Sequence, residues 1–187
     1  MANFIFNSAR RLFSSAQIDW TAAATPAWSN YKIKAALVNK TGGNIQSYAP
    51  PADTSNDSVV YNAGTAGGGG SRNMSTDFGF GLAAASSSLV RDGSNNVITA
   101  ELTNRAFVTT TAACDADDIV FNNVPTNSTA YGAVEGIVIY LEDQAITDGT
   151  TWPVLLFLDT LSGGGMSITP NGGDIVVQWS TSGIFRL

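Results

Sequence analysis

The chain has no histidine among its 187 residues, and this absence removes several kinds of catalytic machinery at once. Serine or cysteine nucleophiles activated by an imidazole, and histidine-based zinc sites, all need that side chain. Carboxylate chemistry stays open, since a glycosidase needs two carboxylates about 5–10 Å apart across a cleft. Glu135 and Glu142 are an odd number of residues apart, so on one strand they point to opposite faces. Glu101 with an aspartate from elsewhere is the other carboxylate option.

Cysteine is nearly absent as well. Cys114 is the only one, so the chain has no intrachain disulfide and no cysteine-based zinc site. We expect Cys114 to be a small buried hydrophobic side chain.

No stretch approaches the ~20 apolar residues of a membrane span, and Arg10 and Arg11 interrupt the beginning of the chain where an export signal would be apolar. We therefore expect synthesis in a cytoplasm and no membrane partner.

Charge is scarce, because Asp, Glu, Lys and Arg make up 13% of the residues, against about 25% in typical soluble domains. The net charge of −6 comes from 15 acidic and 9 basic residues. The basic residues are scattered, whereas binding a phosphate backbone needs clustered Lys and Arg, so we expect no nucleic-acid partner. Weakly charged faces are easier to desolvate against a partner than Lys- and Glu-rich ones. The composition therefore favours a chain that works inside an assembly.

Apolar patterns of strand type are dense in the second half of the chain. The continuous apolar runs at 137–141 and 154–158 predict central strands that are packed on both faces. Apolar residues alternate with Lys32 and Lys34 over 31–38, which predicts a strand with a wet face at its start. Turn clusters separate the strands expected after residue 91, which are 97–102, 105–110, 118–121, 136–142, 153–158, 174–179 and 183–187. This spacing predicts an all-β fold, a jelly-roll-like β-sandwich.

One helix is expected, near the beginning of the chain. Apolar residues recur at helical spacing over residues 4–16, namely at Phe6, Ala9, Leu12, Phe13 and Ala16. We expect this helix and a connector to occupy residues 1–28, and a single β-sandwich domain to occupy residues 29–187. Gly, Ser, Thr, Asn and Pro dominate residues 39–91, which we interpret as an excursion that acts as an arm or gains order against a neighbour.

Two polar motifs are candidate ligand sites. Asp115, Asp117 and Asp118 offer oxygen ligands suited to calcium, but they lack the spacing of the helix-loop-helix calcium motif. A solvated turn is the favoured interpretation, and a bound calcium ion is the alternative. The glycine-rich residues 64–71 resemble a phosphate-binding loop, yet Gly70 stands where that loop needs its lysine. We expect a flexible loop there and no bound cofactor.

Tryptophan is the aromatic residue with the clearest candidate roles. Trp152 and Trp179 lie at the ends of expected strands, so we expect core or interface anchors, with a sugar-stacking platform as the alternative. We expect Trp20 and Trp28 to dock onto a neighbouring subunit. The expected interface side chains are Phe6, Phe13, Trp20, Trp28, Phe78 and Phe80.

The most specific motif of the chain is PNGGDIVVQW at 170–179, followed by IFRL at 184–187. Weaker matching segments are Asn7-Ser8-Ala9, the strand at 31–38, DADDIVF at 115–121, IVIYL at 137–141 and the apolar strand before Asp159. On these segments the chain resembles a family of small virion proteins encoded in the structural gene clusters of tailed bacteriophages. The resemblance touches most of the chain except residues 39–91.

The resemblance implies a non-enzymatic structural protein of the virion, and it transfers no catalytic residue. We expect a capsid decoration or cement protein that stabilises the head lattice. Its expected partners are the major capsid protein or other virion proteins, together with further copies of itself in a homo-oligomer. A tail, collar or fibre component that binds a carbohydrate receptor is the alternative. Either role implies location in the virion after synthesis in the cytoplasm of a bacterial host.

Overall fold

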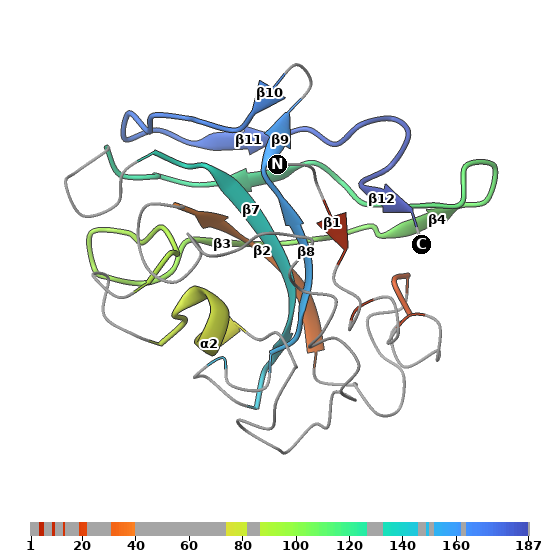
Figure 1. Cartoon of the computed structure of the whole chain (residues 1–187), viewed down its shortest axis with the longest axis horizontal. Helices are drawn as coiled ribbons and strands as arrows, with labels where there is room; N and C mark the ends of the chain where they lie inside the picture. The colour runs from red at the N-terminus through yellow and green to blue at the C-terminus, as the bar shows by residue number, and fades with distance from the viewer. Residues whose placement is uncertain are drawn as a thin grey trace.

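The computed structural model describes residues 4–5, 9, 13, 19–21, 31–39, 74–81, 87–126, 133–145, 149, 152–161 and 164–186. Figure 1 shows that these residues form mainly β-strands, with the short helix α2 (Met74–Phe78) beside them. The strands are β1 (Phe4–Ile5), β2 (Tyr31–Val38), β3 (Thr99–Glu101), β4 (Ala106–Val108), β5 (Ala113–Asp115), β6 (Ile119–Phe121), β7 (Gly136–Asp143), β8 (Val154–Leu158), β9 (Thr160–Leu161), β10 (Gly164–Gly165), β11 (Ile175–Val177) and β12 (Phe185–Arg186). All of their pairings are antiparallel, so the all-β prediction is confirmed.

The largest sheet has five strands in the order β1-β8-β7-β2-β3. Its longest pairing joins β2 to β7 over eight residues each, from Tyr31 opposite Asp143 to Val38 opposite Gly136. Every residue of β8, and every residue of β7 except Glu142, is buried. A continuously apolar strand is stable only when both of its faces are covered. The prediction that 137–141 and 154–158 are central strands is therefore confirmed.

Three smaller sheets accompany the five-stranded one, with the orders β12-β5-β4, β11-β6 and β10-β9. In the β11-β6 sheet, Ile119 and Phe121 are buried while Val120 between them is exposed. This is the alternation of a strand with one face on the core and one in water. One hydrophobic core joins the β12-β5-β4 and β11-β6 sheets to the large one, and it includes Cys114 and Phe185.

The seven strands expected after residue 92 coincide with β3, β4, β6, β7, β8, β11 and β12. The sequence interpretation missed β5, which occupies the beginning of the aspartate-rich stretch that was interpreted as a turn. Its residues Ala113 and Cys114 are small, so their burial left no strong hydrophobic signal.

The helix prediction for residues 4–16 is wrong at its beginning. Phe4 and Ile5 form strand β1 and pair with Phe157 and Leu156 at the edge of β8. An open strand edge needs a partner for its backbone groups, and this tertiary demand overrides the local helical pattern. Ala9 is helical and buried, and Phe13 is helical and half-buried, while the rest of the predicted helix lies outside the described residues.

The description of residues 39–91 as an excursion is wrong for the part that the structure describes. Met74 and Phe78 of α2 are buried, as are Leu89 and Val90. The Phe78 ring lies 6.1 Å from the ring of Phe157, so α2 packs on the five-stranded sheet.

Among the described residues, no helix is long and apolar enough to cross a membrane. The glycine-rich residues 64–71 lie outside the described part of the chain.

Candidate functional site

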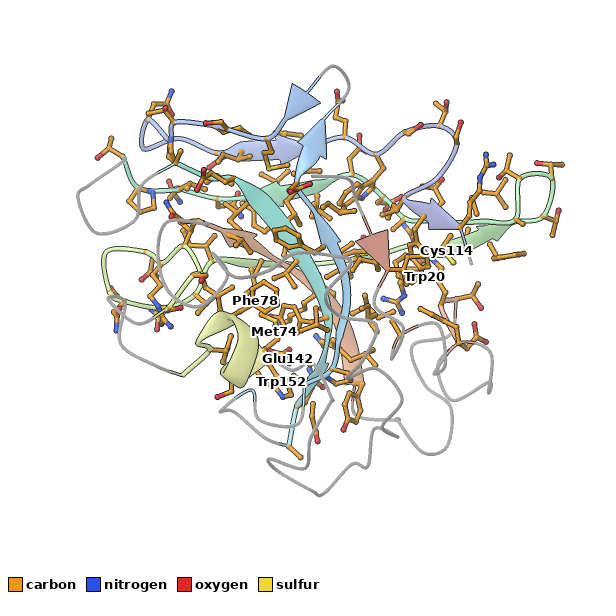
Figure 2. All side chains as sticks on the ribbon, in the orientation of Figure 1. Trp20, Met74, Phe78, Cys114, Glu142 and Trp152 are labelled. Atoms are coloured by element: carbon orange, nitrogen blue, oxygen red, sulfur yellow. The ribbon has the colours of Figure 1, made fainter. Side chains whose placement is uncertain are left out.

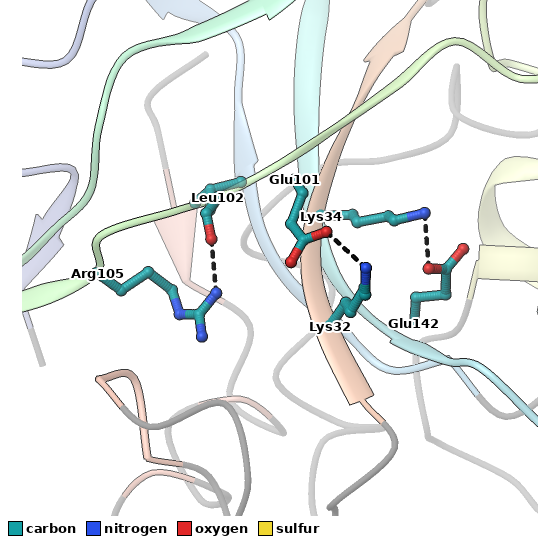
Figure 3. Close-up of polar contacts among 6 residues, drawn as sticks. All are labelled: Lys32, Lys34, Glu101, Leu102, Arg105 and Glu142. Carbon is teal, nitrogen blue, oxygen red and sulfur yellow. Dashed lines mark hydrogen bonds and ion pairs between the residues drawn. The ribbon is translucent and has the colours of Figure 1, made fainter.

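Two ion pairs lie on one face of the five-stranded sheet (Figure 3). The Nζ atom of Lys32 lies 2.8 Å from Oε2 of Glu101, and the Nζ atom of Lys34 lies 2.7 Å from Oε2 of Glu142. The Lys34–Glu142 pair is the more buried, with side chains 21% and 17% exposed against 39% and 38% for the other pair. We call these four residues the charge ladder.

Strand register creates the charge ladder. Lys32 stands opposite Glu142, and Lys34 stands opposite both Tyr140 on β7 and Glu101 on β3. Directly opposed residues of antiparallel strands point to the same face, so all of these side chains share one face. The ion pairs then run diagonally across β3, β2 and β7.

The charge ladder is electrically neutral, because two ammonium groups face two carboxylates. A hydrogen bond and the negative charge of Glu101 raise the pKa of Lys32, and the charge of Glu142 adds to this. Lys32 therefore stays charged at neutral pH. Each carboxylate of the ladder lies against one ammonium. The ladder brings the carboxylates of Glu101 and Glu142 to one face. The sequence alone suggests only two carboxylate pairs, Glu135 with Glu142, which it places on opposite faces, and Glu101 with an aspartate.

Trp152 lies beside Glu142 of the charge ladder and near α2 (Figure 2), and its ring packs against two other aromatic rings. The Trp152 ring stacks on Tyr140 with centroids 5.7 Å apart and also contacts the Phe80 ring at 4.4 Å. Burial, and secondarily the charge of Glu142, raise the pKa of Tyr140. The Tyr140 hydroxyl has no hydrogen-bond partner within the described residues. Tyr140 therefore acts as a packing side chain in this structure.

The described tryptophans share one feature, since each indole N–H donates to a backbone carbonyl. Trp20 donates to Asp115 O at 2.7 Å, Trp152 to Asp143 O at 3.1 Å, and Trp179 to Asp117 O at 2.9 Å. Trp152 was expected to anchor either the core or an interface. It is buried, so it anchors the core. Trp179 is half-buried. These bonds hold the indole rings in place against the strands.

Two of the expected interface side chains are instead part of the core. Trp20 and Phe78 are 3% and 1% exposed, so neither can touch a partner in this conformation, and this expectation is corrected. Phe13 is half-buried against Phe185, and Phe80 is half-buried against Trp152. The remaining two, Phe6 and Trp28, lie outside the described residues.

Trp20 is buried because it packs on the β12-β5-β4 sheet. Its ring meets Phe185 edge to face, with centroids 5.0 Å apart, and Figure 2 places it beside Cys114. Arg105 Nε donates to Trp20 O at 2.8 Å, and its Nη1 donates to Leu102 O, which ties this segment to the strands. Burial raises the pKa of the Cys114 thiol to about 12, so this thiol is not a nucleophile at neutral pH.

The aspartate cluster serves the fold. Asp118 Oδ1 accepts from the backbone N–H of Trp179 at 2.9 Å, and Asp117 Oδ2 accepts from the side-chain amide of Asn104. Asp115 belongs to strand β5, and its carbonyl accepts from Trp20. Within the described part of the chain, no three acidic or cysteine side chains gather as metal ligands would. The side chains of Asp117 and Asp118 therefore make separate contacts within the described part of the chain.

Among the residues that the structure describes, three large apolar side chains are exposed, and all lie in the small sheets. They are Phe107 on β4, Val120 on β6 and Val176 on β11, at 43%, 42% and 58% exposure. Val120 and Val176 stand opposite each other, so they form one apolar patch. Period-2 alternation predicted the strands that carry them, but nothing local marked which residues would face water.

Comparison with protein-family models, with curated proteins and with solved structures finds no match to this chain.

Proposed function

We propose that this chain is a non-enzymatic structural protein of a tailed-bacteriophage virion, most simply a capsid decoration or cement protein. Its sheets would form a sandwich of jelly-roll type, and its partners would be the major capsid protein or other virion proteins. The proposal begins from the resemblance carried by PNGGDIVVQW at 170–179 and IFRL at 184–187.

One observation carries the proposal beyond the sequence. Exposed apolar side chains lie on the small sheets, namely Phe107 on β4 and the opposed pair Val120 and Val176 on β6 and β11. On the five-stranded sheet the charge ladder neutralises itself. Surfaces of this kind lose little hydration free energy when they are covered, so they suit permanent contact with other subunits.

The mechanism would be mass action. A protein that binds only the assembled lattice stabilises that lattice by RT ln(1 + [L]/Kd), about 2.7 kcal/mol per site at a hundredfold excess over Kd. Many such sites on one shell together resist the pressure of the packaged genome. No catalytic step is required, and the neutral charge ladder serves the packing of the sheet.

The test is the number of copies per virion, measured by quantitative mass spectrometry of purified particles. A copy number that scales with the major capsid subunit is the expected result. A few to a few dozen copies per virion would indicate a component of the tail or neck instead. Absence of the chain from particles would overturn the proposal.

A tail, collar or fibre component with a carbohydrate receptor is the second candidate. Trp179 favours it, because this side chain is only half-buried and lies in the closing motif. Sugar stacking on its ring predicts a change in tryptophan fluorescence when host glycans are added, and Trp179→Leu would abolish the change. A cement protein would show no glycan-dependent change in fluorescence, either in the wild-type chain or in Trp179→Leu.

A further inference from the structure

The β11-β6 sheet has an outer face with a regular composition. Along 174–178 and 118–122, exposed residues alternate with buried or half-buried ones. The exposed residues form three rows across the two strands, with Val120 opposite Val176 in the middle row. Continuing the same register places Asp118 opposite Gln178 and Asn122 opposite Asp174.

Strand β11 is an edge strand among the residues that the structure describes. In the part of the chain that the structure describes, β6 is its only pairing partner. Proteins usually protect an exposed edge by keeping it very short, or with charged side chains (especially lysine), proline or a β-bulge. Residues 174–178 read Asp-Ile-Val-Val-Gln, without lysine or proline, and the pairing with β6 has no register shift. A two-stranded sheet is also marginal by itself, so a further strand would stabilise it.

The sequence of this edge is self-complementary. If two copies of β11 pair antiparallel about Val176, that residue meets its own copy, and Ile175 meets Val177 of the second chain. Asp174 then meets Gln178 of the second chain, and the same contact recurs across the two-fold axis. An isologous interface requires this kind of match, in which one patch complements itself.

We propose that β11 is a self-association edge, at which a second copy of this chain adds antiparallel to form a continuous four-stranded β6-β11-β11-β6 sheet. The middle row of its outer face would then hold four valines, two from each chain. Branched apolar neighbours on adjacent strands stabilise a sheet. Val176 is exposed and has Val120 of β6 on one side, and pairing at the axis would place Val176 of the second chain on its other side.

Charge favours a second copy over an unrelated strand. Each outer row would read Asp118, Gln178, Asp174 and Asn122, the last two from the second chain, so acids alternate with amides and no two carboxylates stand directly opposite. Asp174 accepts the backbone N–H of Asn123 through Oδ1 at 2.8 Å, which leaves Oδ2 for the amide of Gln178. A second strand that carried an acid opposite Asp174 would be repelled.

A disulfide across the axis tests the geometry directly. Opposed residues of antiparallel strands have Cα atoms about 4.5–5.5 Å apart, which is within the range of a disulfide. Val176→Cys in the purified full chain should therefore give a covalent dimer under mild oxidation, seen on a non-reducing gel. The native Cys114 is buried and does not compete.

Val120→Cys is the matched control. Val120 lies on the same face and is also exposed, but its strand would be separated from its symmetry copy by two copies of β11. It should form little covalent dimer at the same protein concentration. Equal cross-linking of the two variants, or more with Val120→Cys, would overturn the proposed pairing.

A charge exchange tests the same register without a covalent bond. Gln178→Lys puts an ammonium opposite Asp174 of the second chain, and Gln178→Glu puts a carboxylate there. Two such contacts per dimer should strengthen or weaken the dimer roughly 2- to 30-fold in Kd, measured by sedimentation equilibrium. Asn122→Lys changes the net charge equally, two strands away from the new partner, and should change Kd much less.

A wild-type chain that stays monomeric at every concentration, with no effect of either Gln178 variant, would sink the proposal. The inference goes beyond the virion role, since it concerns the purified chain alone. Copy number in particles tests that role, so failure of one proposal is distinguishable from failure of the other.

Discussion

The five-stranded sheet and the small sheets use the same antiparallel pairing but bury their strands differently. In the large sheet, β7 and β8 are buried on both faces, whereas β6 and β11 each leave a valine in water. Strands that are covered on both sides contribute most of the buried apolar area, and therefore most of the stability. Strands with one open face contribute less to stability but supply the surfaces through which a chain meets its partners.

The difference follows from position in the fold. α2 and the aromatic rings around Trp152 cover one face of the large sheet, and the Phe78 and Phe157 rings lie 6.1 Å apart at that contact. The β11-β6 sheet has Ile119 and Phe121 on the core and no described element over Val120. Four substitution pairs can break or sharpen this contrast.

The largest effect is expected from removing a ring of the large sheet. Phe157→Ala should lower the free energy of unfolding by about 3–5 kcal/mol, because a buried ring leaves a cavity under α2. Phe107→Ala makes the same chemical change on β4, where the ring is 43% exposed, and should cost less than about 1.5 kcal/mol. Urea denaturation of both variants measures the contrast. Equal losses would mean that the small sheet β12-β5-β4 carries as much stability as the large one.

A methyl group added inside the large sheet should be the next most damaging change. A Cβ atom at Gly136 would lie 2.7 Å from Cζ of Phe157, so Gly136→Ala should cost about 1–3 kcal/mol through overpacking. Gly93→Ala, where a Cβ would meet nothing within 4 Å, should be near neutral. Thermal unfolding of the two variants tests this. A Gly136→Ala variant as stable as wild type would show that Phe157 can move aside freely.

The two ion pairs of the charge ladder differ in burial, so breaking each in turn measures the effect of burial within the large sheet. Glu142→Gln leaves the ammonium of Lys34 partly buried without its counter-charge, and should cost about 1–3 kcal/mol. Glu101→Gln breaks the more exposed pair with Lys32 and should cost less, with a loss that fades in high salt. Denaturation at low and high ionic strength separates the two. A larger loss for Glu101→Gln would reverse our ranking.

The smallest effect is expected in the turn between β4 and β5. Ala112 has φ 52°, a left-handed conformation that costs an L-residue about 1–2 kcal/mol. Ala112→Gly relieves that strain, against the extra freedom of glycine in the unfolded chain, and should raise stability by up to about 1 kcal/mol. Ala106→Gly on the adjacent strand should lower it by about 0.5–1 kcal/mol. Melting temperatures that move in the same direction for both variants would contradict this.

Much of the β architecture was readable from the sequence, because hydrophobic periodicity is a local signal. The apolar runs at 137–141 and 154–158 predicted the buried central strands β7 and β8. Lys32 and Lys34 predicted the wetter beginning of β2. The site was less accessible, since Lys34 and Glu142 meet only when the register of β2 on β7 is known.

The sequence alone determined that this chain is an all-β, weakly charged protein without imidazole chemistry, because composition and period-2 alternation follow directly from the order of side chains. Only the tertiary structure decided that Phe4 and Ile5 form a strand, that Trp20 is buried, and that Val176 is exposed. These outcomes depend on which distant backbone lies alongside each residue. Which segment pairs with a strand edge, and which side chains enter the core, depends on the whole chain, whereas local propensity depends on a few neighbouring residues.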